Sequence, residues 1–474
     1  MNQILLGNRL AAVGSPFLQR FQNERLVYSL AHDARRTFAA SCSATDQITG
    51  DEHVQAHQAG CTALCSSSCG GFLASGGADA SIRFWDLQSA SREATVISPL
   101  AALTKADGQA HTHSITSLSI YPFDPTPSTI LSTAFDKTFL LTQITPSSLI
   151  PLHRFTLDYA PYCHAMSPIP SPQPLVAVGT SHPAIRLLDL RSGHSTHSLP
   201  GHNGTVYALS WYPRIDHVLV SGASDGRVLF FDVRRANAAY ASLDLDDAVG
   251  IGPDNTRHPS QLLSFNALAH NGPVNSVQFT SNSPADRLVT TGHDQRIRVW
   301  DLASGRNELV HFGPRIRNER HMQLAPLLSP PGAVTKPSRE ALFWPNDESK
   351  GEIHMHSLRE GQLLRVLKMD GLKRNQETKG SARVLGKGRI NQIVWRMGDS
   401  CDGLEMLSAH GDGSIAVWRS LDDEDGNQVA DDEAGEGAAD ESVSKQIEQS
   451  EMKRKRKREL LEGLVEGLSN KASR

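Results

Sequence analysis

Long apolar runs are the first thing that this sequence lacks. No stretch of its 474 residues approaches the run of about 18 apolar residues that a membrane-spanning helix requires. The first residues, MNQILLGNRLAAVG, carry no basic segment ahead of their apolar one, as a secretory signal would. We therefore expect an intracellular, soluble protein with no membrane partner.

Cysteines and catalytic signatures are also scarce. Of the six cysteines, Cys61, Cys65 and Cys69 lie four residues apart, which matches no common zinc motif, and the other three are scattered. Neither a P-loop nor an HExxH motif occurs. The sequence thus predicts no metal, no cofactor and no catalytic residue, and a protein that is not an enzyme.

One pattern of polar and aromatic residues does recur. In its clear copies an aspartate lies six residues before an aromatic side chain: Asp79 and Trp85, Asp225 and Phe231, Asp294 and Trp300, Asp412 and Trp418. Three of these copies also begin with a histidine, namely His57, His202 and His270. A catalytic triad occurs once in an enzyme, whereas a hydrogen-bonded motif that stabilises a structural repeat occurs in several of the repeats. We therefore interpret the His, Ser or Thr, Asp and Trp residues as structural hydrogen-bonded tetrads, because buried polar groups need partners.

The aromatic position serves as a ruler for the whole chain. With Thr142, Leu188 and His356 accepted as degenerate marks, the ruler positions are 85, 142, 188, 231, 300, 356 and 418, which lie 43 to 69 residues apart. Short alternating or β-branched runs between Gly, Asp, Asn and Ser turns indicate strands. The pattern is typical of WD-repeat propellers, whose repeats are four-stranded blades. We predict an all-β fold, a seven-bladed WD-repeat β-propeller over residues 26–421, with polar insertions at about 237–262, 306–340 and 369–388.

The two ends of the chain differ from the repeats. Because the last unit supplies only three strands, we expect its outer strand to come from residues 26–57. Residues 1–25 predict a short helical arm, and two of its segments can each form one apolar face: Leu5, Leu6, Arg9 and Leu10, then Phe17, Leu18 and Phe21 after a helix start at Pro16. Such an arm could enter a groove of a partner or fold back over the propeller, and the sequence leaves both open.

The C-terminal residues 422–474 have a strongly uneven charge. Ten acidic residues and no basic one lie between Asp422 and Ser444, and residues 453–458 are KRKRKR. Such charge blocks bury little apolar surface, so we predict a disordered tail. KRKRKR favours a nuclear import signal over a nucleic-acid patch, because no aromatic residues alternate with the basic ones. Direct nucleic-acid contact stays open.

Several stretches are more specific than the repeat. YCHAMSPIPSPQPLVAVGTSHPAIRLLDLRSG, SWYPRIDHVLVSGASDGRVLFFDVRRA and GHDQRIRVWDLASGRNELVHFG resemble the Cockayne syndrome A family, over about residues 105–420. The resemblance implies a nuclear substrate receptor of a cullin-RING ubiquitin ligase in transcription-coupled nucleotide excision repair. Its implied partners are the ligase's damaged-DNA-binding adaptor, bound through an N-terminal helical segment and one propeller face, and repair factors at stalled RNA polymerase II.

Two adjacent repeats carry an Asp-x-Arg motif directly after the ruler position, at the end of the third strand. These are Asp189 with Arg191 and Asp232 with Arg234. Receptors of this ligase class tend to have this motif, and a planar guanidinium suits an interface anchor. The alternative is that each arginine pairs with the aspartate of its own blade. A competing function is a nuclear WD-repeat scaffold in chromatin or RNA processing, without a ligase.

Deleting residues 450–460, which include KRKRKR, should move the protein from the nucleus to the cytoplasm. The thermal unfolding temperature should not change, because a charged tail adds no packed core. Fluorescence imaging of tagged wild type and deletion tests this, and unchanged nuclear accumulation would assign the basic run another role.

Overall fold

The computed structural model describes residues 16–40, 55–88, 96–124, 126–235, 239–245, 267–280, 286–313, 316–318, 324–346, 351–369, 388–397 and 404–420. Three features predicted from the sequence lie outside these residues: the tail 422–474, the KRKRKR run, and the first helical segment with Leu5, Leu6, Arg9 and Leu10.

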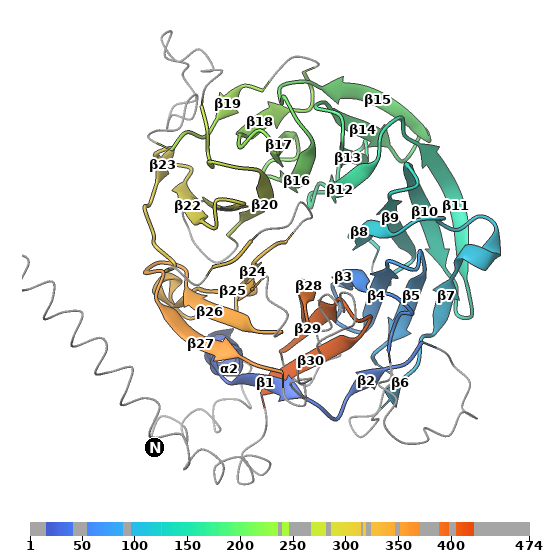
Figure 1. The fold of residues 1–474 in the computed structure, drawn as a ribbon, viewed down its shortest axis with the longest axis horizontal. Helices are drawn as coiled ribbons and strands as arrows, with labels where there is room; N and C mark the ends of the chain where they lie inside the picture. The colour runs from blue at the N-terminus through green and yellow to red at the C-terminus, as the bar shows by residue number, and fades with distance from the viewer. Residues whose placement is uncertain are drawn as a thin grey trace, which may run out of the picture. The chain divides into compact units, whose positions relative to one another are not determined.

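Seven four-stranded antiparallel sheets, the blades, stand in a ring (Figure 1). Blade 1 comprises β3(Cys61–Ser66), β4(Phe72–Gly77), β5(Ile82–Asp86) and β7(Ala101–Leu103). Blade 2 comprises β8(Ile115–Ile120), β9(Thr129–Ala134), β10(Thr138–Ile144) and β11(Leu149–Thr156). Blade 3 comprises β12(Pro161–Met166), β13(Leu175–Thr180), β14(Ile185–Asp189) and β15(His194–Leu199). Blade 4 comprises β16(Val206–Trp211), β17(Val218–Ala223), β18(Val228–Asp232) and β19(Ala241–Ser242). Blade 5 comprises β20(Val274–Phe279), β21(Arg287–Gly292), β22(Ile297–Asp301) and β23(Arg306–Asn307). Blade 6 comprises β24(Leu327–Leu328), β25(Ala341–Pro345), β26(Ile353–Ser357) and β27(Leu363–Leu367), and blade 7 comprises β28(Ile390–Arg396), β29(Glu405–His410), β30(Ile415–Ser420) and β1(Leu30–Asp33).

The strand register confirms the seven predicted units. Each ruler residue lies on the third strand of a blade and faces an apolar residue of the second strand. The pairs are Leu73 and Trp85, Ile130 and Thr142, Val176 and Leu188, Leu219 and Phe231, Leu288 and Trp300, Leu342 and His356, Met406 and Trp418. The degenerate marks at Thr142, Leu188 and His356 therefore occupy true repeat positions.

Two predicted insertions are partly regular structure, and the first, residues 237–262, includes β19, the outer strand of blade 4. Residues 306–340 include β23, the outer strand of blade 5, and β24, the inner strand of blade 6. Each of these strands has only two residues, too few to show the alternation on which the sequence prediction depended. The surplus length at these two points is thus smaller than the sequence predicts.

The ring closes as predicted, with a strand from the N-terminal side. β1 pairs antiparallel with β30, so that Leu30 faces Ser420 and Asp33 faces Val417. Asp33 is almost fully buried and forms an ion pair with Arg419 at 2.8 Å. A further pair of short strands, β2(Thr37–Phe38) and β6(Val96–Ile97), runs parallel beside blade 1.

Helix α2(Pro16–Tyr28) begins at proline, as the sequence predicts, and leads into β1. Its end packs on the propeller: Val27 of the helix and Leu30 of β1 are fully buried in a cluster with Phe343 of blade 6 and Trp418 of blade 7. The predicted boundary between arm and propeller, at residues 25 and 26, falls inside this helix. No helix in the described part of the chain is long and apolar enough to cross a membrane.

Candidate functional site

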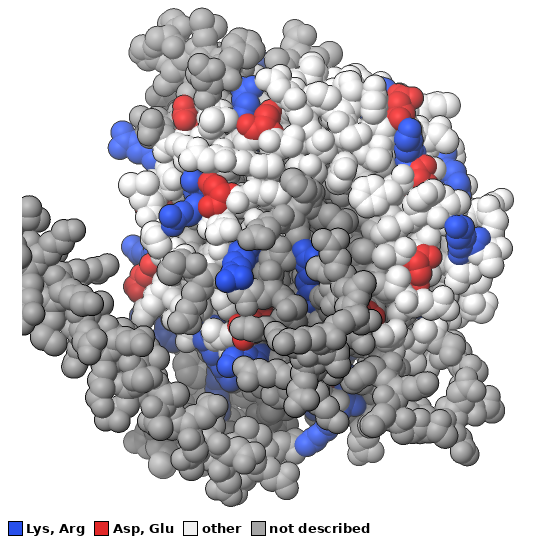
Figure 2. All heavy atoms as spheres, viewed as in Figure 1, with Lys and Arg blue, Asp and Glu red and all other residues white. Residues whose placement is uncertain are grey.

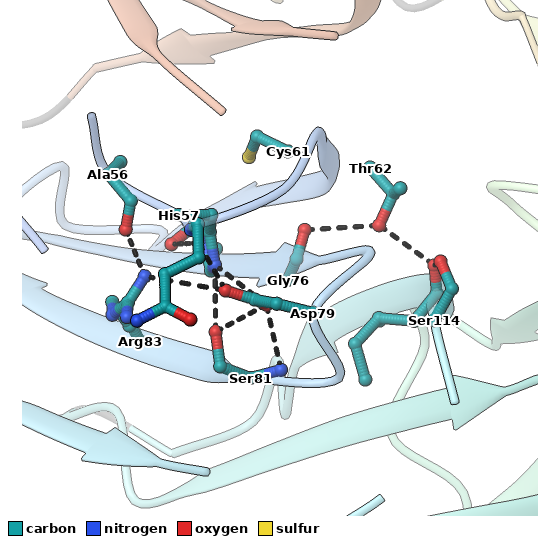
Figure 3. A network of polar contacts seen from close by, with 12 residues as sticks. Ala56, His57, Cys61, Thr62, Gly76, Asp79, Ser81, Arg83 and Ser114 are labelled. Atoms are coloured by element: carbon teal, nitrogen blue, oxygen red, sulfur yellow. Dashed lines mark hydrogen bonds and ion pairs between the residues drawn. The ribbon is translucent and has the colours of Figure 1, made fainter. Parts of the chain in front are cut away.

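The tetrad of blade 1 connects its two middle strands, β4 and β5, with the loop that precedes the blade. His57 Nε2 lies 2.8 Å from the Ser75 hydroxyl, which also accepts a hydrogen bond from Trp85 Nε1 at 2.8 Å. On its other side His57 Nδ1 faces Asp79 at 3.3 Å and Ser81 at 2.9 Å. Figure 3 shows His57, Asp79 and Ser81 converging between the strands. Ser75 is fully buried, so its hydroxyl has a structural role and is out of reach of a substrate.

The other predicted tetrads have the same geometry. In blade 5, His270 contacts Asp294 at 3.0 Å and Thr290 at 2.8 Å, and Trp300 donates to the same threonine hydroxyl at 2.9 Å. In blade 4, His202 contacts Asp225 at 3.2 Å and Ser221 at 2.6 Å. Phe231 replaces the tryptophan there and closes the site by packing alone, with its ring 6.2 Å from His202.

Blade 2 contains a further histidine, His111, with the partners of a tetrad, and it was not among the predicted tetrad residues. His111 lies 3.1 Å from Asp136 and 2.9 Å from Ser132. Its ruler residue is Thr142, whose buried hydroxyl finds no hydrogen-bond partner among the described residues. The signal was present, since Asp136 precedes Thr142 by the same six residues as in the clear copies.

Blade 7 supplies its imidazole from a different position. Ser408 accepts a hydrogen bond from Trp418 at 2.8 Å and contacts His410 Nε2 at 2.8 Å. His410 follows Ser408 by two residues, where blades 1 and 5 have Gly77 and Gly292. A Cβ at Gly292 would lie 2.5 Å from His270 Nδ1, so both positions cannot hold a histidine without a shift.

Blades 3 and 6 fill the same space with apolar side chains. Val178 takes the hydroxyl position of blade 3 and packs with Leu188 in one buried cluster. Trp344 takes that position in blade 6, where it is fully buried and packs with Leu324 and Leu342. Each blade centre is thus closed either by a polar tetrad or by a largely apolar cluster, and among the described residues the Thr142 hydroxyl of blade 2 and Trp344 Nε1 of blade 6 are buried without a hydrogen-bond partner.

Burial sets the protonation state of His57, His270 and His410. Burial lowers the pKa of His57 and His270 below the ordinary histidine value, although each ring is hydrogen-bonded to an aspartate. Burial also lowers the pKa of His410 to about 4. For Asp79 and Asp294, burial by itself would raise the pKa, but hydrogen bonds from the histidines hold it well below the ordinary value. Near neutral pH the tetrads of blades 1 and 5 therefore pair a neutral imidazole with a carboxylate.

Strand direction assigns the loops to two ends of the propeller. The tetrad aspartates lie between the second and third strands of each blade. The connections between first and second strands, and between third and fourth, lie at the opposite end because neighbouring strands are antiparallel. Arg191 and Arg234 follow the third strands β14 and β18, so both belong to this opposite end, here called the DxR end.

The two Asp-x-Arg turns differ in how their arginines are held. Arg234 forms a bidentate pair with Asp232, at 3.0 and 2.9 Å, while remaining 62% exposed. This is the alternative in which the arginine pairs with its own blade. Arg191 is exposed, and its backbone N–H donates to Asp189 at 2.9 Å. Outer strands of the preceding blades bind both turns, since His153 donates to the Gly193 carbonyl and His197 to the Val233 carbonyl.

Helix α2 is also anchored at the DxR end. Its buried Glu24 accepts hydrogen bonds from the Thr335 backbone N–H at 2.8 Å and from Arg339 at 2.7 Å. Both partners lie between β24 and β25, the first and second strands of blade 6. Phe21, one turn earlier, is 50% exposed, and the side chains of Phe17 and Leu18 lie outside the described residues. The end of α2 thus covers the propeller, while Phe21 remains half-exposed to solvent.

On the face seen in Figure 2, described basic side chains are interspersed with acidic ones. Within the described ranges, no group of three or more His, Cys, Asp or Glu residues could hold a metal ion. The loop GLKRNQETKGSARVLGKGR, a possible nucleic-acid contact, lies almost entirely outside these ranges.

The ring and its recurring tetrads are those of a WD-repeat β-propeller, a fold that generally serves as a non-catalytic interaction scaffold. Residues 52–86, 193–232 and 260–301 match the family model of the WD domain, G-beta repeat.

The chain is 27% identical over 316 residues to the WD repeat-containing protein ATCSA-1 of Arabidopsis thaliana, covering 54% of this chain and 69% of that protein. A shorter match is with the ribosome biogenesis protein YTM1 of Podospora anserina, which is 35% identical over 25% of this chain and 24% of its own length. A third relative, the histone acetyltransferase type B subunit 2 of Debaryomyces hansenii, is 30% identical over 24% of this chain and 30% of its own.

Moving a tetrad histidine should move its stabilising effect. His270→Gly leaves Thr290 and Asp294 without their imidazole and should lower the free energy of unfolding by about 1 to 3 kcal/mol. Adding Gly292→His, which copies His410 of blade 7, should restore about 1 kcal/mol. Urea unfolding compares the two variants, with Gly292→His alone as the control that should destabilise by crowding His270. A double variant less stable than His270→Gly would show that the positions are not equivalent.

Acid should destabilise the fold before Asp79 and Asp294 of the tetrads are protonated. His57, His270 and His410 have lowered pKa values in the folded state, so the unfolded chain binds more protons below its histidine pKa of about 6.5. Their stabilising effect is present above that pH and lost below it, at up to about 1.4 kcal/mol per pH unit for each ring. Urea unfolding between about pH 7 and pH 5 measures the slope. His113→Gln, which changes an exposed ring, should leave it unaltered, and a flat profile for wild type would contradict the assignment.

Proposed function

We propose that this protein is the substrate-receptor subunit of a cullin-RING ubiquitin ligase that acts in transcription-coupled nucleotide excision repair. It has no catalysis of its own and works in the nucleus. It binds the ligase's damaged-DNA-binding adaptor through its N-terminal arm and propeller rim, and it presents targets near repair factors at stalled RNA polymerase II.

One observation carries the proposal beyond the fold. The Asp-x-Arg turns of blades 3 and 4 and the anchored end of α2 all belong to the DxR end of the propeller. An adaptor that uses both the arm and the rim needs them at the same end. The resemblance of blades 2 to 7 to the Cockayne syndrome A family, and the similarity to ATCSA-1, support the choice of ligase.

A nuclear scaffold in chromatin or RNA processing is the second candidate. The matches to a histone acetyltransferase subunit and a ribosome biogenesis protein favour it, although each covers only about a quarter of this chain. A scaffold would need neither the arm nor the arginines for an adaptor.

Binding of purified adaptor separates the two functions. Arg191→Asp together with Arg234→Asp should weaken adaptor binding at least about tenfold while the propeller stays folded, because both side chains are exposed. Deleting residues 1–22 should act in the same direction, since it removes Phe17 and Phe21 but keeps the Glu24 anchor. Binding isotherms measure all three proteins. If wild type, double variant and deletion bind equally, or if wild type does not bind, the ligase function gives way to the scaffold.

A further inference from the structure

Blade 6 has an arginine at the DxR end that the sequence motif does not reveal. His356 holds the ruler position, so Ser357 and Arg359 stand where blades 3 and 4 have the aspartate and arginine of Asp-x-Arg. Arg359 is exposed, and its guanidinium has no partner among the described residues. Because Ser357 replaces the aspartate, no carboxylate of the same turn neutralises this arginine as Asp232 does Arg234.

A short chain of contacts joins Arg359 to helix α2. Glu24 of α2 pairs with Arg339 at 2.7 Å, and the neighbouring Glu340 carbonyl accepts a hydrogen bond from the Leu358 backbone N–H at 2.9 Å. Arg359 follows Leu358 directly. The helix end is held on the other side as well, since Tyr28 donates to the Arg339 carbonyl at 2.9 Å. Figure 1 shows α2 beside β27 and β1, next to blade 6.

The surface formed in this way has a distinct chemistry. Its exposed basic side chains are Arg20 and Arg25 on α2 and Lys336, Arg339, Arg359 and Arg365 on blade 6. On the acidic side, Glu24 is buried and already paired, which leaves Glu360 exposed beside Arg359. Phe21 adds a half-exposed apolar side chain. Charge complementarity therefore favours an acidic partner surface with an apolar recess.

We propose that α2 and blade 6 form one composite docking surface for the adaptor, with Arg359 as its charged anchor and Phe21 as its apolar one. This inference rests on the proposed function and adds the part of the propeller that the adaptor contacts most closely. An adaptor carboxylate must compete with Asp232 to reach Arg234, but it meets Arg359 unpaired. Arg359 consequently contributes more to binding than Arg234 does.

Single charge reversals test the inference with the full chain and purified adaptor. Arg359→Glu should weaken binding at least about tenfold, and more than Arg234→Glu does, with the difference shrinking at high salt. Lys137→Glu is the matched control, since this exposed side chain lies in the connection between β9 and β10, at the tetrad end. Thermal unfolding of each variant shows that the propeller is intact.

The outcomes distinguish the inference from the function on which it rests. If wild type and Arg359→Glu bind the adaptor equally while Phe21→Asp loses affinity, the composite surface is wrong and the ligase function stands. If wild type itself does not bind, both fall. Equal losses from Arg359→Glu and Lys137→Glu would indicate a long-range charge effect and would also overturn the inference.

Discussion

The pairing of β1 with β30 is the interaction on which the rest of the structure depends. It gives blade 7 its fourth strand and removes an open sheet edge, whose unpaired backbone groups would otherwise attract other chains. Only Ser29 separates α2 from β1, so closing the ring also places the end of the helix. The buried pair between Asp33 and Arg419 lies on the same two strands and is screened from water. Closure and helix placement are therefore one event.

Inside the ring, the Thr142 hydroxyl of blade 2 and Trp344 Nε1 of blade 6 find no hydrogen-bond partner among the described residues, so the constraint that every blade meets is to fill its centre. Blades 1, 2, 4 and 5 meet it with a histidine from the preceding loop, and blade 7 meets it with His410 from its own second strand. Blades 3 and 6 replace the hydroxyl with Val178 and Trp344. These solutions use different residues at equivalent register positions, which is why a degenerate repeat still forms a regular blade.

The two ends of the propeller therefore serve different purposes. Histidine and aspartate at the tetrad end are mostly buried and hydrogen-bonded to each other, so they stabilise the fold and are not available to a partner. At the DxR end, arginines reach solvent, and the residue at the aspartate position decides whether the guanidinium is neutralised locally. Asp232 holds Arg234, whereas Ser357 leaves Arg359 unpaired. A partner would therefore recognise an arginine whose charge is not neutralised in its own turn, whether or not that turn has the Asp-x-Arg motif.

The sequence by itself determined the number of blades, the ruler positions and the source of the closing strand. These follow from local spacing: six residues from aspartate to aromatic fix a tight turn between two strands, and a blade one strand short needs an outside partner. The tetrads at His57, His202 and His270 were predictable for the same reason. His111 was missed because Thr142 hides the aromatic signal, and β23 and β24 because two residues show no alternation. Only the tertiary structure decided that Glu24 binds blade 6, that Arg234 is paired, and that Arg359 is free. Each of these depends on contacts between residues far apart in the chain, or on a register that the sequence of blade 6 does not display.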